Sequence, residues 1–233
     1  MSRAYYSNSI SSFLRDGPEN ILGLLTQAHN FTLLNTQRDA WLKQTTQLQK
    51  WLSNFTGDIY FEFSIPRMGK RVDVVLVIGS AVFVVEFKVG ASDYLRADLD
   101  QVIDYSLDLS NFHEGSHKAF IVPILISTEV KKSALEHISV PEDKIFIPIL
   151  TNGSNLSAII KSVLSQLPKE LINPVTWEES GYKPTPTIVE ATLALYGGHS
   201  VVDISRNDAG ATNLSKTSST VASIIEHSRN NKE

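Results

Sequence analysis

The sequence contains no cysteine, which excludes several kinds of chemistry at once. Disulfide bonds, thiolate zinc sites and cysteine nucleophiles all require a residue that the chain does not have. The absence is compatible with a reducing compartment. We therefore expect a cytoplasmic protein without covalent cross-links.

Long hydrophobic segments and an excess of positive charge are also missing. The main apolar stretches, 74–78 and 81–85, are separated by Gly79 and Ser80 and fall far short of the roughly 20 residues that span a bilayer. The N-terminus is polar and does not resemble a signal peptide. The formal net charge is −4, so nucleic-acid binding would need a local basic patch rather than a general basic field. We expect no membrane partner.

The spacing of apolar residues predicts an alternation of helices and strands. Helical spacing is found over 9–14, 18–25, 35–55, 94–109 and 156–167. Strand-like patterns are found over 58–65, 71–78, 81–89, 120–127 and 145–150. In the first of these strands apolar and polar residues alternate, which predicts one buried face. The order predicts an α/β fold with a mixed central sheet flanked by helices.

The same patterns suggest three parts of the chain. Residues 1–57 form a helical N-terminal part that includes the first core helix, and residues 58–167 form the α/β core. Residues 168–233 are rich in proline, glycine and small polar residues, and we expect a loop-rich extension there with helices near 187–195 and 220–227.

Two carboxylates and a lysine are expected to meet in the middle of the sheet. Glu86 and Lys88 share one face of a strand by alternation, and Asp73 lies on the preceding strand of the hairpin. Such groups are costly to bury without a purpose. A buried Glu–Lys ion pair at a sheet end is the structural alternative.

Phosphodiester hydrolysis would explain why these residue types occur together. Asp73 and Glu86, with the backbone carbonyl of Phe87, would bind Mg²⁺ or Mn²⁺ through oxygen. The metal would polarise the phosphate and activate water. Lys88 would orient the water or offset developing negative charge.

The pattern of Asp73, a hairpin and Glu86-Phe87-Lys88 resembles the signature of the PD-(D/E)XK nucleases, with Val72 where proline often stands. The resemblance implies a restriction-endonuclease-like core of helix, three strands, helix and strand. Gln101 and Tyr105 resemble the Q-x-x-x-Y motif of RecB-like members, and their i, i+4 spacing places both on one helix face. A polar helix face with a packed tyrosine is the alternative.

One feature departs from the family's pattern. Members of the superfamily often carry an acidic residue on the helix before the first strand, but no glutamate occurs between Thr36 and Phe55, where Gln37 and Asp39 stand. Glu62, on the first strand, is a candidate metal ligand instead. A solvated strand residue is the equal alternative.

The resemblance extends over nearly the whole chain. Segments such as "RMGKRVDVVLVIG", "VVEFKVGA", "DQVIDYSLDLSNFHEGSH" and "PTPTIVEATLALYGGHSV" are similar to the amino-terminal region of bacterial Schlafen-like nuclease–helicase proteins. This implies action on DNA, or less readily RNA, with a helicase domain or subunit as partner and a role such as phage defence. The sequence has no G-x-x-x-x-G-K-[ST] motif, so the chain would be a fragment or a stand-alone form.

Further motifs compete with this interpretation. His113 to His117 matches H-E-x-x-H, but Gly115 indicates that the helix ends there, which predicts a connection rather than a zinc-protease site. Arg67, Lys70 and Arg71 surround the turn before Asp73 and are predicted to contact the nucleic-acid backbone, with a solvated turn as the alternative. A non-cutting nucleic-acid-binding or regulatory module is the main functional alternative.

Overall fold

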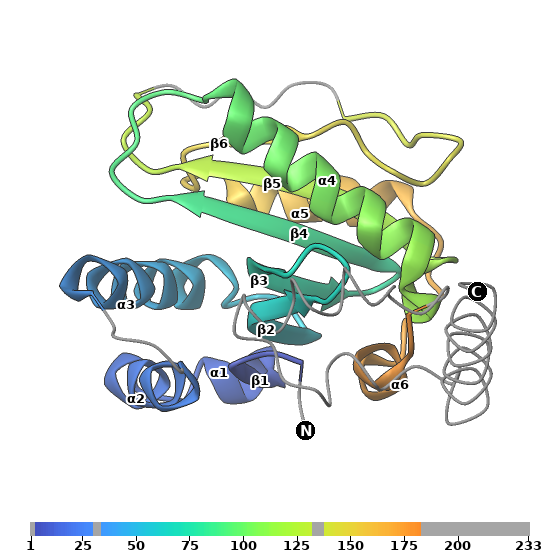
Figure 1. The fold of residues 1–233 in the computed structure, drawn as a ribbon. Helices are drawn as coiled ribbons and strands as arrows, with labels where there is room; N and C mark the ends of the chain where they lie inside the picture. Colours follow the sequence, from blue (N-terminus) through green and yellow to red (C-terminus); the bar gives the residue numbers. More distant parts are fainter. Residues whose placement is uncertain (1–2, 30–33, 132–137, 183–233) are drawn as a thin grey trace, which may run out of the picture.

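A computed structural model describes residues 3–29, 34–131 and 138–182 of the chain, so the helices expected near 187–195 and 220–227 lie outside the described residues. In chain order the elements are β1 (Tyr6–Ser9), α1 (Ile10–Phe13), α2 (Pro18–Ala28), α3 (Asn35–Trp51), β2 (Asp58–Ile65), β3 (Lys70–Ile78), β4 (Ala81–Lys88), α4 (Arg96–Phe112), the 3-10 turn η1 (Glu114–Ser116), β5 (Phe120–Ser127), β6 (Ile149–Thr151), α5 (Leu156–Gln166) and α6 (Pro174–Glu179) (Figure 1).

The strands form one open, mixed sheet in the order β1-β2-β3-β4-β5-β6. Pairing is antiparallel from β1 to β4, whereas β4, β5 and β6 run parallel to one another. Parallel neighbours need a long crossover, and α4 supplies it between β4 and β5. The predicted α/β architecture with helices flanking a mixed sheet is therefore confirmed. Within the described ranges, no helix has the length and apolar character needed to cross a membrane.

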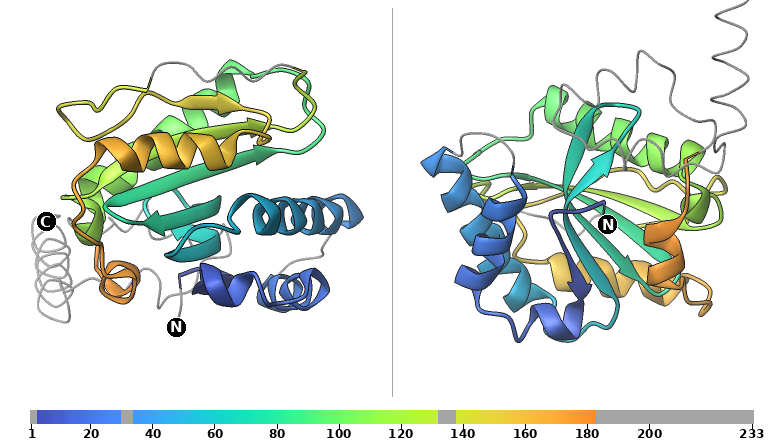
Figure 2. Two further views of the ribbon diagram at one scale, coloured as in Figure 1. Left: turned by 180° about the vertical axis from the view of Figure 1, so that it is seen from behind. Right: turned by 60° about the horizontal axis from the view of Figure 1, so that its bottom comes forward.

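The two faces of the sheet bury separate hydrophobic cores. On one face, α2, α3 and α5 supply residues such as Leu25, Leu48 and Ile160. On the other, α4 and α6 supply residues such as Val102 and Trp177. Figure 1 and the view from behind at the left of Figure 2 show α4 and α5 on opposite faces of the sheet. The central strands are apolar on both sides for this reason.

The apolar residues of β2 do not all lie on one face of the sheet, so the prediction of a single buried face is wrong. Ile59 and Phe61 pack into the α3 core, whereas Phe63 and Ile65 pack into the α4 core. The change occurs at Glu62, whose φ is +52°. A left-handed conformation is rare for a residue with a side chain and is concentrated at functional sites.

Three further elements differ from the predicted ones. The edge strand β1 was not predicted because its sequence, YSNS, is polar and only its pairing with β2 defines it. Strand β6 is limited to Ile149–Thr151, although Ile145 forms an isolated bridge with Ile121. Helix α6 begins at Pro174 within the segment predicted to be loop-rich, because Asn173 caps the N–H of Thr176 and proline is well suited to a first helical position.

Candidate active site

Glu86 and Lys88 lie at the end of β4, on the face covered by α4. Val82 and Val84 precede them on the same face and belong to the α4 core, as strand alternation requires. Glu86 is almost fully buried, with 3% of its surface exposed, whereas Lys88 is partly exposed. The ammonium group of Lys88 lies 3.2 Å from Oε1 of Glu86.

Asp73 lies where the regular pairing of β3 with β4 has ended. Regular pairing of these strands ends at Val74 and Val85, one residue before Asp73 and Glu86 would face each other. Instead, the Asp73 carboxylate accepts a hydrogen bond of 2.8 Å from the N–H of Phe87. Because the N–H and C=O of one strand residue point to the same edge, the Phe87 carbonyl also faces β3. The predicted trio of Asp73, Glu86 and Lys88 is thus brought together.

Gln101 on α4 connects these residues to Tyr105. Its amide nitrogen donates to Oε1 of Glu86 and to the hydroxyl of Tyr105, both at 2.8 Å, and its oxygen accepts from Nζ of Lys88 at 3.1 Å. Asp98, one turn earlier on α4, lies 3.3 Å from the same ammonium group. One helix face therefore holds the strand residues in a continuous hydrogen-bond network, as the Q-x-x-x-Y spacing predicts.

Burial dominates the electrostatics of the carboxylates. It raises the pKa of Glu86 well above its ordinary value, and the nearby Asp73 adds to this effect. Burial also raises the pKa of Asp73 to about 6, although the Phe87 N–H and Lys88 oppose the rise. Partial burial acts to lower the pKa of Lys88, but Glu86 and Asp98 outweigh it and the pKa lies above the ordinary value. Burial therefore favours the protonated forms of Glu86 and Asp73, and the ammonium group of Lys88 opposes this only in part.

Glu62 completes the group of carboxylates from the neighbouring strand. It stands opposite Asp73, between the pairs Phe61–Val74 and Phe63–Val72. Burial raises its pKa to about 7, and repulsion from Asp73 contributes. Its Oε1 accepts a hydrogen bond of 2.8 Å from the indole N–H of Trp41 on α3. Glu62 is therefore held beside the site and is not a solvated strand residue.

Glu62, Asp73 and Lys88 line a cleft between α3 and the ends of the central strands. Its walls are Gln37, Ala40, Trp41, Gln44, Glu62, Asp73, Phe87, Lys88 and Val89. Neither Trp41 nor Gln44 was predicted as a site residue. Their signal was the i, i+4, i+7 spacing of Gln37, Trp41 and Gln44, which puts a polar, aromatic and polar side chain on the helix face that meets the sheet.

The donor set fits a hard divalent cation. Oε2 of Glu86 is buried and accepts no hydrogen bond from the described residues, so this oxygen is available to a ligand. No three His, Cys, Asp or Glu side chains are grouped as a metal centre within the described part of the chain. The oxygen atoms that would hold a cation belong to the carboxylates of Asp73 and Glu86 and to the backbone carbonyl of Phe87. Oxygen ligands of this type suit Mg²⁺ or Mn²⁺.

Two of the three predicted nucleic-acid contacts already have partners inside the protein. Arg67 lies 3.6 Å from Asp108 and stacks over the Phe112 ring. Arg71 donates to the Glu62 carbonyl at 2.9 Å. Lys70 is exposed at the turn. Among these three, Lys70 is the exposed side chain.

The H-E-x-x-H motif forms a helix end and not a zinc site. His113 is the C-cap of α4 and is fully buried, while Glu114–Ser116 forms a 3-10 turn. The His113 ring nitrogens contact the hydroxyls of Ser116 at 2.8 Å and Ser180 at 2.9 Å. Burial lowers the pKa of His113 well below its ordinary value. The predicted helix-to-strand connection is confirmed.

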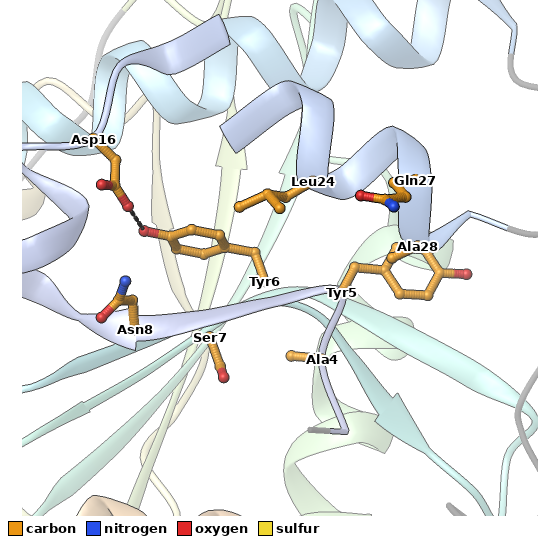
Figure 3. A pocket seen from close by; sticks show the side chains of 9 residues that line it. All are labelled: Ala4, Tyr5, Tyr6, Ser7, Asn8, Asp16, Leu24, Gln27 and Ala28. Atoms are coloured by element: carbon orange, nitrogen blue, oxygen red, sulfur yellow. Dashed lines mark hydrogen bonds between the residues drawn. The ribbon is translucent and has the colours of Figure 1, made fainter. Parts of the chain in front are cut away.

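A second hollow lies between β1 and α2, away from the carboxylates (Figure 3). Asp16 is the single charged residue in its described lining, and its carboxylate accepts a hydrogen bond of 2.7 Å from the hydroxyl of Tyr6. Tyr5, Leu24 and Gln27 make up much of the remaining wall. This hollow brings together no group of reactive side chains, so the cleft at Asp73 is the candidate active site.

Comparisons of the chain with family models, curated proteins and solved structures yield no match.

Proposed function

We propose that the protein is a metal-dependent nuclease that hydrolyses phosphodiester bonds, with DNA as the favoured substrate. The observation that carries the proposal is the network in which Gln101 joins Glu86, Lys88 and Tyr105 beside the Asp73 carboxylate. A simple buried ion pair would satisfy Lys88 and Glu86 alone. It would not require a second carboxylate in the gap between β3 and β4, or an unpartnered buried oxygen on Glu86.

Each residue has a distinct role in the proposed reaction. Asp73, Glu86 and the Phe87 carbonyl would hold Mg²⁺ or Mn²⁺, and the bound ion would polarise the phosphate and lower the pKa of a water molecule. Lys88 stays protonated because Glu86 and Asp98 raise its pKa, and it offsets negative charge as the phosphate is attacked. Gln101 fixes the Lys88 ammonium group, and Tyr105 fixes Gln101 in turn. Such preorganisation is the usual source of catalytic power in a site of this kind.

The restriction-endonuclease-like assignment belongs to this proposal. Its support is the order α3, β2, β3, β4, α4, β5, which agrees with the core implied by the sequence resemblance. The proposed helicase partner and a role in phage defence rest on that resemblance alone. Lys70 is the proposed contact to the nucleic-acid backbone on the surface.

A non-cutting nucleic-acid-binding module is the second candidate function. The observation that favours it is that Lys88 is already engaged by Glu86, Asp98 and Gln101. A lysine in that position could serve as a structural cross-link between β4 and α4. Binding that weakens with salt but is never followed by cleavage would support this alternative.

The decisive experiment compares the wild-type protein with Glu86→Gln and Lys88→Met variants. Plasmid DNA, single-stranded DNA and RNA are incubated with Mg²⁺ or Mn²⁺, and product formation is followed over time. We expect cleavage by the wild type, its loss in both variants, and its loss on addition of EDTA. Equal cleavage by wild type and Glu86→Gln would show that the activity comes from a contaminant and that the proposal is wrong.

A further inference from the structure

We propose that Gln44 binds the divalent cation of the cleft from the α3 side, directly or through one water molecule, together with Glu62. This inference rests on the proposed function, because it assumes that Asp73 holds a cation. It assigns to α3 a part of the site that neither Asp73 nor Glu86 supplies. Gln44 lines the same cleft as Asp73, Glu62 and Lys88.

The first observation is an unsatisfied oxygen in a buried side chain. Gln44 has only 5% of its surface exposed, and its Oε1 accepts no hydrogen bond from the described residues. Burying an amide oxygen without a hydrogen-bond donor is unfavourable, because the oxygen loses its contact with water and gains nothing in exchange. Native structures rarely retain such an atom unless water, an ion or a ligand satisfies it.

The second observation is that the surrounding walls offer acceptors and few donors. Glu62 and Asp73 contribute carboxylates to the cleft, and the indole N–H of Trp41 is already used by Glu62. Lys88 already contacts Glu86, Asp98 and Gln101. A cation or its bound water would satisfy an additional acceptor oxygen in these surroundings, since hard cations prefer oxygen ligands and Mg²⁺ retains several waters.

The third observation is the unusual backbone conformation of Glu62, which lines the same cleft as Gln44. Glu62 adopts a φ of +52° opposite Asp73, and the hydrogen bond from Trp41 holds its carboxylate. Trp41 and Gln44 are three residues apart on α3 and so share one helix face. The helix therefore presents one residue that orients Glu62 and one that faces the cleft itself.

The test measures Mn²⁺ binding by isothermal titration calorimetry, together with the rise in melting temperature that saturating Mn²⁺ produces. Gln44→Leu keeps the approximate volume but removes the oxygen, and Gln44→Glu adds a charge. Gln47→Leu is the matched control, because Gln47 lies one turn further along α3 and does not line the cleft. Asp73→Asn removes the central carboxylate and tests the cation site itself.

We expect Gln44→Leu to weaken Mn²⁺ binding roughly tenfold, which is the scale of outer ligands of metal sites, and Gln44→Glu to restore or exceed wild-type affinity. Gln44→Leu should fold normally without metal, because it removes an unsatisfied buried atom. Unchanged Mn²⁺ affinity in Gln44→Leu, with binding abolished in Asp73→Asn, would overturn this inference and leave the proposed function intact. Absence of Mn²⁺ binding by the wild type would overturn both.

Discussion

The indole N–H of Trp41 donates a 2.8 Å hydrogen bond to the carboxylate of Glu62 and thereby joins α3 to the one residue of β2 with a left-handed backbone. This contact connects two elements that precede the Asp73 strand. It aligns the helix that lines the cleft with the strands that carry the carboxylates. Loss of this hydrogen bond should therefore change both the stability of the fold and the position of the Glu62 carboxylate.

Trp41→Phe keeps an aromatic ring in the core but removes the N–H donor. We expect a loss of about 1–3 kcal/mol in the free energy of unfolding, as for a hydrogen bond to a charged group. The donor favours the ionised carboxylate, and the pKa of Glu62 is raised to about 7. The loss measured by urea denaturation in EDTA should therefore be larger at pH 8.5 than at pH 5.5. Trp51→Phe, a control on the same helix, should show a loss that does not change with pH.

The Asp73 carboxyl group should make the metal-free protein less stable as pH rises. Its folded-state pKa is raised to about 6, so the folded state binds a proton more tightly than the unfolded state does. Its stabilising contribution is complete below the unfolded pKa near 4 and is lost as pH rises through about 6.

The measurement is the free energy of unfolding in EDTA at pH 4.5 and pH 8 for wild type and Asp73→Asn. We expect the variant to gain stability relative to wild type at pH 8 by on the order of 2 kcal/mol. Its amide oxygen can still accept from the Phe87 N–H. A difference between the two proteins that is the same at both pH values would contradict the assigned pKa shift.

Lys88→Met should separate catalysis from metal binding. The substitution removes the ammonium group but retains a side chain of similar length, so we expect cleavage to fall by about 10²–10³-fold. Mn²⁺ affinity should be maintained or improved, because a positive charge beside the carboxylates is gone. Kinetics and calorimetry on the same preparation provide the measurement. Lys161→Met, on the exposed surface of α5, should leave both quantities unchanged.

Gln101 and Tyr105 should behave as one unit. Gln101→Leu removes all three contacts of the amide, whereas Tyr105→Phe removes only the 2.8 Å bond between them. We expect Gln101→Leu to reduce the cleavage rate more than Tyr105→Phe does. The double variant should be no slower than Gln101→Leu, because coupled residues are not additive. Additive losses in this cycle would indicate that Tyr105 acts independently of the network.

Most of the architecture could be predicted because it is encoded locally. The apolar stretches around Val75 and Val84 are continuous, rich in β-branched residues and separated by Gly79, so strand and hairpin signals agree. Strand β1 and helix α6 could not be predicted in this way. Polar Ser7 becomes part of a strand only by pairing with Tyr60, and Trp177 defines α6 by entering a core formed by distant residues.

The site was predictable in part for the same reason. Alternation placed Glu86 with Lys88, and helical spacing placed Gln101 with Tyr105. The role of Trp41 could not be predicted, because it depends on the left-handed backbone conformation of Glu62, and no local sequence pattern indicates that conformation. The partners of Arg67 and Arg71 likewise come from tertiary contacts with Asp108 and the Glu62 carbonyl.

The change of face within β2 restricts how far Glu62 can move. The strand contributes Phe61 to one core and Phe63 to the other, so Glu62 is clamped between two packed layers that lie on opposite faces of the sheet. Any displacement of Glu62 must disturb packing on both faces. Close-packed interiors resist such deformation. The Glu62 carboxylate is therefore attached to a backbone segment that is packed on both faces of the sheet, so a bound cation would have to adapt to its position.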